Sequence, residues 1–454
     1  MSVAIKISDI TPNLLRKLDK DLHIKPIVKE AVFGNKSFPK ASAKPVEAFD
    51  QYVKNGVQHA VLPFSYYFQN LESIQRVESE CESREFEFIG NLLPRQIEVK
   101  KEVIEILNRT GSVVLSLHTG FGKTVMAIYL ASKVKMRTVI LCHRTIIIDQ
   151  WVQSIKKYIP TAKVCVLGEK LTKKALKERD YDETNCDFLI CNVINVDKRD
   201  RNFYSSFGLL IVDEIHTICT TSFSKSLLYI FPEYVIGLSA TPFRTDGMDR
   251  IIELFCGPEI VYRKLYRPFN VYKVSTNFKP NSETNISGTL DWNSVLEDQA
   301  SNTERNTLIV NICRYFLSRN ILVLVKRKEH AAILRNMLAS KGEDVDVFTG
   351  DSKECNYNCR ILVATYSKGG TGFDHPKLDL LIGAADVLES FTQYIGRVFR
   401  RDDTNPIYID LIDEMSTIKK HSMERLKICK ELGADVKPFS KSFPDFEEMV
   451  KLLN

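Results

Sequence analysis

Residues 113–132 read VVLSLHTGFGKTVMAIYLAS, an apolar run joined to a helical pattern by a glycine-rich turn. Residues 113–117 predict a short buried strand, and residues 124–132 predict a helix. Gly120 and Gly122 let the chain turn without a Cβ, so backbone N–H groups and the start of the helix can face phosphate oxygens. This strand, loop and helix together predict a nucleotide site.

The side chains of the loop fit the same prediction. Lys123 can reach the β and γ phosphates, and the Thr124 hydroxyl can ligate Mg²⁺. A structural turn is the alternative, because Leu117 stands where the full phosphate-loop pattern begins with a small residue. The strand and the helix around the loop favour the nucleotide. The predicted ATP-binding residues of the loop are His118, Thr119, Gly120, Phe121, Gly122, Lys123 and Thr124.

A second apolar run, residues 208–212, ends in the string Asp213-Glu214-Ile215-His216. It suits a strand that is buried on both faces, and side chains at the carboxyl end of a parallel strand face the crevice where ligands bind. We expect Asp213 to hold Mg²⁺, directly or through water, and Glu214 to be the general base for the attacking water. An isolated Asp-Glu pair is more often a solvated turn, but the phosphate loop upstream reverses that preference.

The string Ser239-Ala240-Thr241-Pro242 follows a further apolar run, residues 235–238. A strand end and a turn would explain three small residues and a proline. Their place one strand after the carboxylates also suits hydroxyls that sense loss of the γ-phosphate. The predicted coupling residues are His216, Ser239, Ala240 and Thr241.

An arginine-rich string, QYIGRVFR at residues 393–400, lies in the second half of the chain, which has no phosphate loop of its own. Residues 390–400 predict a helix with Gln393, Arg397 and Arg400 on one face. A solvated basic helix would explain the arginines but not Gly396, which costs a helix about 1 kcal/mol relative to Ala. Because arginine pairs bidentately with phosphate oxygens, we expect these arginines to act on the nucleotide held by the first half. Which of the two is the arginine finger stays open.

In their order these motifs resemble those of the superfamily 2 helicases, and the resemblance covers residues 92–413. The ordered set is Gln96, TGFGKT, CHR with QW beyond it, DEIH, SATP, TYSKGGTGFD and QYIGRVFR. Residues 239–247 (SATPFRTDG), 325–330 (VKRKEH) and 369–374 (GGTGFD) resemble the XPB-type DNA helicases and the poxvirus transcript-release helicase. Each motif alone is a weak signal, whereas the order is specific.

The resemblance implies roles for further residues. Gln96, preceded by Arg95, would read adenine, although a polar residue at a helix start is the alternative. Gly372 and Asp374 would couple the polymer to the ATP side, and Gln393 would lie near the two arginines. Contacts to the sugar-phosphate backbone, which grip any base sequence, would come from His143, Arg144, Asn192, Lys326, Arg327, Thr349, Gly350, Thr365, Gly369 and Gly370. Singly these are ordinary loop residues, but they recur just after strand ends in both halves.

Strands and helices alternate along most of the chain, which predicts parallel sheets flanked by helices. The expected fold class is α/β, and the resemblance makes it two tandem RecA-like parallel-sheet domains with a small N-terminal α+β accessory domain. The accessory domain would bind duplex or a partner, or simply cap the motor. The expected divisions are residues 1–88 (accessory domain), 89–262 (first helicase domain), 263–289 (linker), 290–415 (second helicase domain) and 416–454 (a C-terminal helical tail for packing or docking). The expected strands are residues 113–117, 138–141, 164–167, 188–191, 209–212, 235–238, 321–325, 345–348, 361–365, 378–382 and 407–411, with a helix over 303–318.

Composition agrees with such a protein. The 454 residues are 44% hydrophobic, and a net charge of +6 argues against a globally basic packaging protein. Eleven scattered cysteines do not form a secreted disulfide framework, so we expect a reducing compartment. Cys355 and Cys359 have no second pair at ligand spacing, so free thiols are favoured over zinc. Without a long apolar run, the protein is expected to be soluble and intracellular. A viral protein would lie in the host cytoplasm, in a viral factory, or in the virion, and a cellular protein would lie in the nucleus.

The function predicted first is an ATP-dependent DNA helicase or translocase, moving 3′ to 5′ by resemblance, with ATP and Mg²⁺ as cofactors. Transcript release, replication and repair all stay open as its process. An RNA helicase or a transcription-complex remodeller is the alternative among enzymes, and an ATP-gated nucleic-acid clamp is the alternative outside catalysis. The expected partner is nucleic acid, DNA before RNA, with RNA polymerase or transcription factors as further candidates and no membrane.

Overall fold

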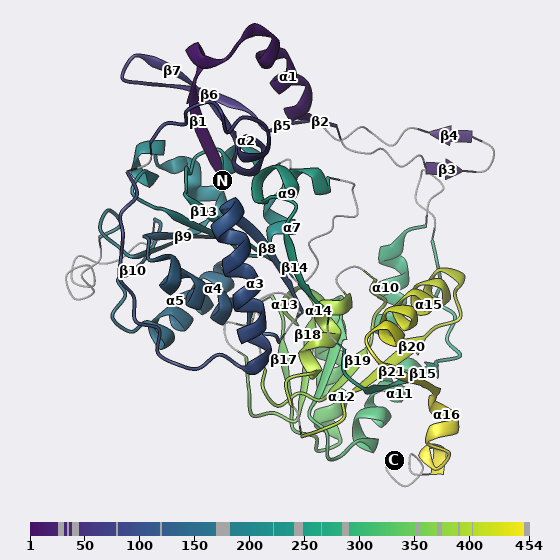
Figure 1. Ribbon diagram of the computed structural model, residues 1–454. Helices are drawn as coiled ribbons and strands as arrows, with labels where there is room; N and C mark the ends of the chain where they lie inside the picture. Colours follow the sequence, from purple (N-terminus) through teal and green to yellow (C-terminus); the bar gives the residue numbers. More distant parts are fainter. Residues whose placement is uncertain are drawn as a thin grey trace. The chain divides into compact units, whose positions relative to one another are not determined.

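The computed structural model describes residues 1–25, 31–33, 36–38, 45–78, 80–118, 120–168, 182–220, 222–239, 248–264, 266–283, 290–350, 352, 355–369, 375–388, 391–401 and 403–448. The chain divides into two compact units, Met1–Arg263 and Lys264–Asn454 (Figure 1). Each unit contains one seven-stranded parallel sheet, which confirms the predicted α/β class. Among the described residues, no helix has both the length and the apolar character needed to span a bilayer.

The sheet of the first unit has the strand order β10-β11-β9-β12-β13-β8-β14. Its strands are parallel because helices lie between them in the chain and carry the backbone back to the same edge. The strands are β8 (Ser112–Leu117), β9 (Thr138–Cys142), β10 (Val164–Val166), β11 (Phe188–Asn192), β12 (Leu209–Val212), β13 (Tyr234–Ser239) and β14 (Ile260–Arg263). The longer helices are α3 (Pro94–Thr110), α4 (Lys123–Val134), α5 (Thr145–Tyr158) and α9 (Asp249–Cys256).

Both faces of this sheet are buried, which explains its uninterrupted apolar strands. Val113 and Leu115 belong to a core shared with α3, α4 and α5, while Val114 between them belongs to the core on the opposite face. Burying one such aliphatic side chain contributes about 1.5–3 kcal/mol. The sheet therefore forms a rigid platform whose carboxyl edge can hold loops in place.

The N-terminal module is an α+β structure that shares the second of these cores. Its antiparallel sheet has the order β1-β7-β6, and Ile5 and Leu62 of that sheet lie in one apolar cluster with Val114 and Leu141 of the parallel sheet. The module consists of β1 (Ser2–Lys6), η1 (Ile7–Asp9), α1 (Pro12–Leu22), β2 (His23–Ile24), β3 (Ala31–Phe33), β4 (Lys36–Phe38), β5 (Val46–Glu47), β6 (Asp50–Lys54), β7 (Val57–Pro63) and α2 (Phe64–Asn70). It is packed into the first unit through a common core.

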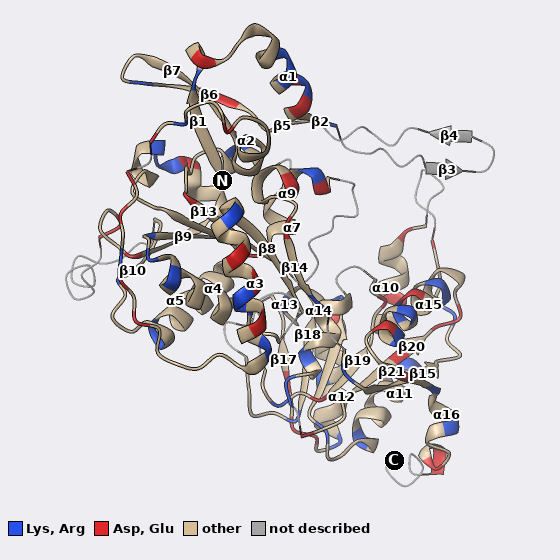
Figure 2. Cartoon of the chain, in the orientation of Figure 1, with Lys and Arg blue, Asp and Glu red and all other residues tan. Residues whose placement is uncertain are grey.

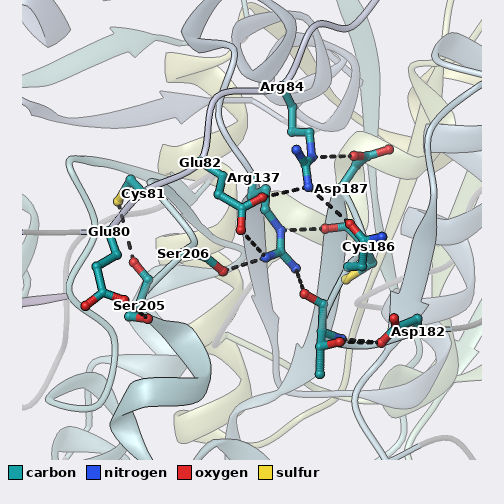
Figure 3. A network of polar contacts seen from close by, with 12 residues as sticks. Glu80, Cys81, Glu82, Arg84, Arg137, Asp182, Cys186, Asp187, Ser205 and Ser206 are labelled. Carbon is teal, nitrogen blue, oxygen red and sulfur yellow. Dashed lines mark hydrogen bonds and ion pairs between the residues drawn. The ribbon is translucent and has the colours of Figure 1, made fainter.

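A buried arginine holds the segment after this module against the amino ends of the strands (Figure 3). Arg137, 1% exposed, donates through Nε to Cys186 O at 2.8 Å and through Nη2 to Thr184 O at 2.9 Å. Its Nη1 donates to Ser206 Oγ and lies 3.5 Å from Glu82 Oε1. Removing one partner of such a buried charge costs about 3–5 kcal/mol. This network stabilises the sheet edge opposite the predicted site.

The sheet of the second unit has the order β17-β18-β16-β19-β20-β15-β21. Its strands are β15 (Phe269–Ser275), β16 (Ile321–Val325), β17 (Val345–Phe348), β18 (Ile361–Thr365), β19 (Leu380–Gly383), β20 (Ile407–Ile412) and β21 (Ala434–Pro438). The helices around it are α10 (Trp292–Ser301), α11 (Thr303–Tyr315), α12 (Lys328–Ser340), α13 (Tyr366–Gly369), α14 (Phe391–Ile395), α15 (Ser416–Glu431) and α16 (Phe439–Ser442).

Three strands lie where no strand was expected, namely β14, β15 and β21. β15 falls inside the range expected to be linker, yet it pairs with β20 and β21 of the second sheet. β21 falls inside the tail expected to be helical, where it forms the sheet edge. Both sequences mix polar with apolar residues, as expected near a sheet edge, where β21 is largely exposed and pairs with β15. The tail therefore contains the helices α15 and α16, as expected, and in addition a strand that joins the second unit's sheet.

Candidate functional site

The predicted site residues of the first unit converge on the carboxyl edge of its sheet. β9, β12, β13 and β8 are neighbours in that order. His143, Asp213 and His118 each come directly after one of these strands, and Ser239 ends another. Parallel strands bring their carboxyl ends to one edge, which is where α/β proteins bind ligands. The structure thus brings together residues that are up to 121 positions apart in the chain (239 − 118).

The phosphate loop turns through two left-handed glycines. Gly120 and Gly122 have φ of +86° and +95°, and Gly122 directly precedes α4. Phe121 between them is buried in the core and anchors the loop. The Lys123 ammonium donates to Leu117 O at 3.1 Å, so the side chain curls back over the loop. The backbone N–H groups that open α4 and this ammonium form a cradle that suits phosphate oxygens.

Gln96 joins the start of α3 to the phosphate loop. Its side chain is 4% exposed, donates through Nε2 to Phe121 O at 2.9 Å and accepts from Leu93 N at 2.9 Å. A Cβ on Gly122 would lie 2.6 Å from Gln96 Nε2, so only glycine fits there. Beside it, the Arg95 guanidinium lies 5.5 Å from the centre of the Phe121 ring. Adenine contact by Gln96 and Arg95 stays a prediction, while their contacts to the loop are structural facts.

Asp213 and Glu214 form a partly buried acidic pair. Asp213 Oδ2 accepts from Trp151 Nε1 at 2.8 Å, and Asp213 Oδ1 accepts from Glu214 N at 3.0 Å. Burial, and next the neighbouring Glu214 carboxylate, raise the pKa of Asp213 to about 6, although the Trp151 hydrogen bond and Lys123 act in the opposite direction. The partner Trp151 was not predicted, because it lies 62 residues away in the chain.

Glu214 adopts an unusual backbone conformation. Its φ of 49° and ψ of 57° lie in the left-handed region, which costs a non-glycine residue about 1–3 kcal/mol. Glu214 Oε2 is buried and has no hydrogen-bond partner among the described residues. A buried carboxylate oxygen in this state can accept a proton from a water molecule, as a general base must.

The coupling residues lie next to this pair. His216 Nδ1 is 2.8 Å from Ser239 Oγ and 3.5 Å from Glu214 Oε2. The contact joins the helix α7 (Ile215–Ile218) to the end of β13. Ala240 and Thr241 lie outside the described residues. The part of the coupling string that is described therefore touches the acidic pair directly.

The residues predicted to hold Mg²⁺ fit that ion. Mg²⁺ keeps several waters and takes one or two carboxylates together with substrate phosphates, so Asp213 and the Thr124 hydroxyl are sufficient protein ligands. The raised pKa of Asp213 reflects a buried carboxylate for which a nearby cation would be favourable. Elsewhere in the described chain, no group of three or more His, Cys, Asp or Glu side chains could hold a metal ion.

The predicted polymer contacts of the second unit also lie at one sheet edge. Lys326, Thr349 and Thr365 follow or end the neighbouring strands β16, β17 and β18. Lys326 Nζ lies 5.3 Å from the centre of the Tyr366 ring. Thr365 Oγ1 lies 3.1 Å from Ser367 Oγ. In the first unit, Lys and Arg alternate with Asp and Glu along helix α3 (Figure 2).

Other residues that were predicted to contact the polymer have partners within the protein. Arg327 donates to Asn293 O at 3.3 Å and pairs with Glu297, and Asn192 Oδ1 accepts from Ile194 N at 3.2 Å. Arg144 is exposed at the start of α5, while Gly350 and Gly369 lie against side chains of their own unit. Outside the described residues lie Thr119, Gly370, Gly372 and Asp374.

The arginine box differs from its prediction. The α-helix runs only over Phe391–Ile395, a 3₁₀ turn follows over Gly396–Val398, and Arg400 lies beyond both. The single helical face expected for Gln393, Arg397 and Arg400 is therefore wrong. Gly396 sits where the α-helix gives way, as expected for a residue that costs about 1 kcal/mol in a helix. Gln393 and Arg397 are nevertheless both buried, at 6% and 8% exposure.

Arg267, which was not predicted, fixes the segment after the arginine box. It donates through Nη1 to Phe399 O at 3.2 Å and through Nη2 to Arg401 O at 2.5 Å and to Thr404 O at 2.9 Å. Its own N–H bonds to Leu432 O at 3.0 Å. Nothing in the sequence around Arg267 signals these partners, which lie more than a hundred residues away.

Comparisons with known proteins agree with this geometry. A family model described as "Type III restriction enzyme, res subunit" matches residues 89–244, which contain the phosphate loop and the acidic pair. The protein named "Putative helicase 161L" of Invertebrate iridescent virus 6 is 36% identical over 97% of this chain and 100% of its own length. "Putative helicase 055L" of Frog virus 3 is 33% identical over 76% of this chain and 79% of its length.

Two further similarities are more distant. "Putative ATP-dependent RNA helicase L396" of Acanthamoeba polyphaga mimivirus is 27% identical over 84% of this chain and 76% of its length. The structure of S. cerevisiae Dbp5 bound to RNA and ADP BeF3 superposes with a TM-score of 0.54, covering 80% of this chain and 97% of Dbp5 at 13% identity. At that identity the superposition bears on the fold alone, and it matches the two sheets to tandem RecA-like domains.

Proposed function

The chain belongs to the superfamily 2 helicase family that includes these large-DNA-virus relatives, and from this premise we propose that it is an ATP-driven motor on nucleic acid, with DNA as its first track. The main support for the proposal is the partly buried pair Asp213 and Glu214, whose Asp213 carboxylate lies within range of the Lys123 charge of the glycine loop. One carboxylate accepts a hydrogen bond from Trp151, and the other has an oxygen, Glu214 Oε2, that accepts no hydrogen bond from a described residue. Such a division of roles suits one metal ligand and one base.

The proposed chemistry is hydrolysis of the terminal phosphoryl group. Lys123 and the N–H groups opening α4 bind the phosphates. A Mg²⁺ ion held by Asp213 and Thr124 would neutralise phosphate charge. Glu214 Oε2 takes a proton from the attacking water, whose oxygen forms the new bond to phosphorus as the bond to the leaving ADP oxygen breaks.

We assign the arginine box to the same nucleotide on chemical grounds. A planar, permanently charged guanidinium pairs with phosphate oxygens, and an arginine supplied to a phosphoryl transfer is worth about 10³–10⁵ in rate. Loss of Arg397 or Arg400 should therefore reduce turnover far more than nucleotide affinity. Cycles of nucleotide binding and release would then open and close the two units and move the polymer.

Residues that end or directly follow strands support nucleic acid as the track. His143, Lys326 and Thr365 offer hydrogen bonds and charge to a sugar-phosphate backbone, a grip that ignores base sequence and suits a translocating protein. RNA is the second candidate track, favoured by the name of the mimivirus relative. Transcript release beside an RNA polymerase, replication and repair are the processes in which such a motor would serve.

ATPase measurements test this proposal. The rate should rise at least tenfold with single-stranded or duplex DNA, and both Lys123→Ala and Glu214→Gln should abolish it. Glu214→Gln should still bind nucleotide, because the amide removes the base but keeps the shape of the side chain. Stimulation by RNA alone would overturn the DNA assignment only. No stimulation by any polymer, with both variants as active as the wild type, would overturn the motor itself, and nucleotide-dependent binding without hydrolysis would indicate a clamp.

A further inference from the structure

Thr217 bridges a predicted polymer contact and the proposed general base. It lies in the short helix α7, and its Oγ1 donates to Glu214 O at 2.8 Å. The same oxygen is 3.2 Å from His143 Nδ1. His143 directly follows β9, the strand next to β12, whose end carries the acidic pair. A single hydroxyl therefore connects two loops on one sheet edge.

The contact matters because Glu214 is held in a strained conformation. Hydrogen bonds at both Glu214 N and Glu214 O stabilise this left-handed backbone. Thr217 supplies two of them, since its N–H and its hydroxyl both donate to Glu214 O at 2.8 Å. Loss of the hydrogen bond from the Thr217 hydroxyl would weaken the support of the backbone that orients the Glu214 carboxylate.

The direction of the Thr217 hydrogen bond depends on what His143 binds. The Thr217 hydroxyl has one proton, so while it donates to Glu214 O, His143 must donate from Nδ1 and keep a lone pair on Nε2. Burial, and next Arg144 and His216, lower the pKa of His143 to about 4, so the ring is neutral at pH 7. No contact between described residues uses His143 Nε2.

A phosphate oxygen at Nε2 would reverse the arrangement. Phosphate oxygens only accept hydrogen bonds, so a neutral His143 must then carry its proton on Nε2. The ring stays neutral, because the proton on Nδ1 passes to solvent while Nε2 takes one from solvent. Nδ1 becomes an acceptor, and the Thr217 hydroxyl turns to it and leaves Glu214 O.

We propose that Thr217 is a positioning residue through which nucleic-acid phosphate at His143 adjusts Glu214 for hydrolysis. The inference rests on the proposed function and adds to it a route by which the polymer controls the ATPase. It assigns Thr217 no contact with nucleotide or polymer. Its effect should appear in the polymer-stimulated fraction of the rate rather than in polymer affinity.

Matched substitutions test the bridge in the full chain. Thr217→Val keeps the shape of the side chain without the hydroxyl, and Thr217→Ser restores the hydroxyl. His143→Gln keeps a polar group near the position of Nε2 but removes Nδ1. We expect Thr217→Val and His143→Gln each to reduce the ratio of stimulated to basal ATPase at saturating polymer at least tenfold, and Thr217→Val to change the Kd for polymer less than threefold. Thr217→Ser should retain at least half of the wild-type ratio.

The double variant decides whether the two residues act as one link. If they do, Thr217→Val combined with His143→Gln loses no more stimulation than either change alone. Wild-type stimulation in Thr217→Val, or losses that multiply in the double variant, would overturn the bridge while leaving the motor proposal intact. A wild-type protein that no polymer stimulates would instead overturn the proposed function, so the two failures are distinguishable.

Discussion

Gly122 and Gln96 set the shape of the phosphate loop at the scale of single residues. Gly122 has φ +95°, and a Cβ on it would lie 2.6 Å from Gln96 Nε2. Gln96 cannot simply move away, because the same nitrogen donates to Phe121 O inside the loop. An added methyl group therefore strains the backbone and breaks the contact that holds the loop.

Gly122→Ala should weaken ATP binding at least tenfold, equivalent to about 1.4 kcal/mol. Titration with a fluorescent ATP analogue measures the change. Gly56→Ala is the matched control, because Gly56 has φ +78° but nothing within 4 Å of an added Cβ, and it lies in the N-terminal module. Equal nucleotide affinity for both variants would contradict the loop geometry described above.

The residues of the loop and of the acidic pair could be predicted from the sequence, because each motif is contiguous and its chemistry follows from its own side chains. Their partners could not. Trp151 reaches Asp213 across 62 residues, and Arg267 reaches Phe399 across 132. Such hydrogen bonds depend on which loops the fold brings together, and no local pattern encodes them.

At the scale of elements, helix α15 holds the segment that leads into the arginine box. Arg425 on that helix donates through Nε to Asp410 at 2.9 Å and through Nη1 to Asp386 at 2.6 Å and to Val387 O at 2.9 Å. All three charged side chains are buried. The C-terminal tail therefore supports the backbone four residues before α14 begins (391 − 387).

Arg425→Met should destabilise the second unit by about 3–5 kcal/mol, because it leaves two buried carboxylates without their cation. Arg425→Lys should recover only part of the lost stability, since the lysine ammonium lacks the planar guanidinium with which Arg425 reaches both carboxylates. Urea unfolding measures the loss. Lys427→Met, an exposed position on the same helix, should change stability by less than about 0.5 kcal/mol, and a similar loss in both would contradict the role of Arg425.

His330 gives the packing of α12 on α11 a dependence on pH. Its ring is buried, with Nε2 2.8 Å from Asn306 Oδ1. Burial, and next Arg305, lower the pKa of His330 from 6.5 to about 3. The unfolded chain therefore binds a proton below pH 6.5 that the folded chain does not bind until about pH 3.

Stability should therefore fall as the pH drops from 6.5 towards 3, by at most about 1.4 kcal/mol per pH unit from this residue. His330→Gln removes the titrating group and should make the decline shallower. Urea midpoints at pH 7.5, 6.5 and 5.5 for both proteins give the difference in slope, which separates His330 from the other groups that titrate there. Parallel slopes would count against a neutral buried His330.

Strands with continuous apolar runs were predictable as elements, because β8, β12, β16 and β18 are buried on both faces. β15 and β21 were missed because their sequences mix polar and apolar residues near the sheet edge. The arginine-box helix was predicted too long, since Gly396 and the packing around it replace its last turn with a 3₁₀ turn.

At the scale of the whole molecule, the chain consists of two sheet units that carry different motifs. The first unit carries the glycine loop and the acidic pair, and its core continues into the N-terminal module. The second carries the arginine box and is completed by the C-terminal strand and helix. The alternation of strands and helices predicted these two sheets, whereas the fusion of the terminal segments into them depends on long-range packing.

Strand displacement measures whether the protein is an ATP-driven motor. The wild-type protein is incubated with duplexes carrying a 3′ or a 5′ single-stranded tail, with ATP and Mg²⁺, and release of the labelled strand is followed over time. An ATP-driven motor should show ATP-dependent release from the 3′-tailed duplex and at least a hundredfold slower release by Glu214→Gln. Release that is equally fast without ATP, or equally fast in Glu214→Gln, would contradict it.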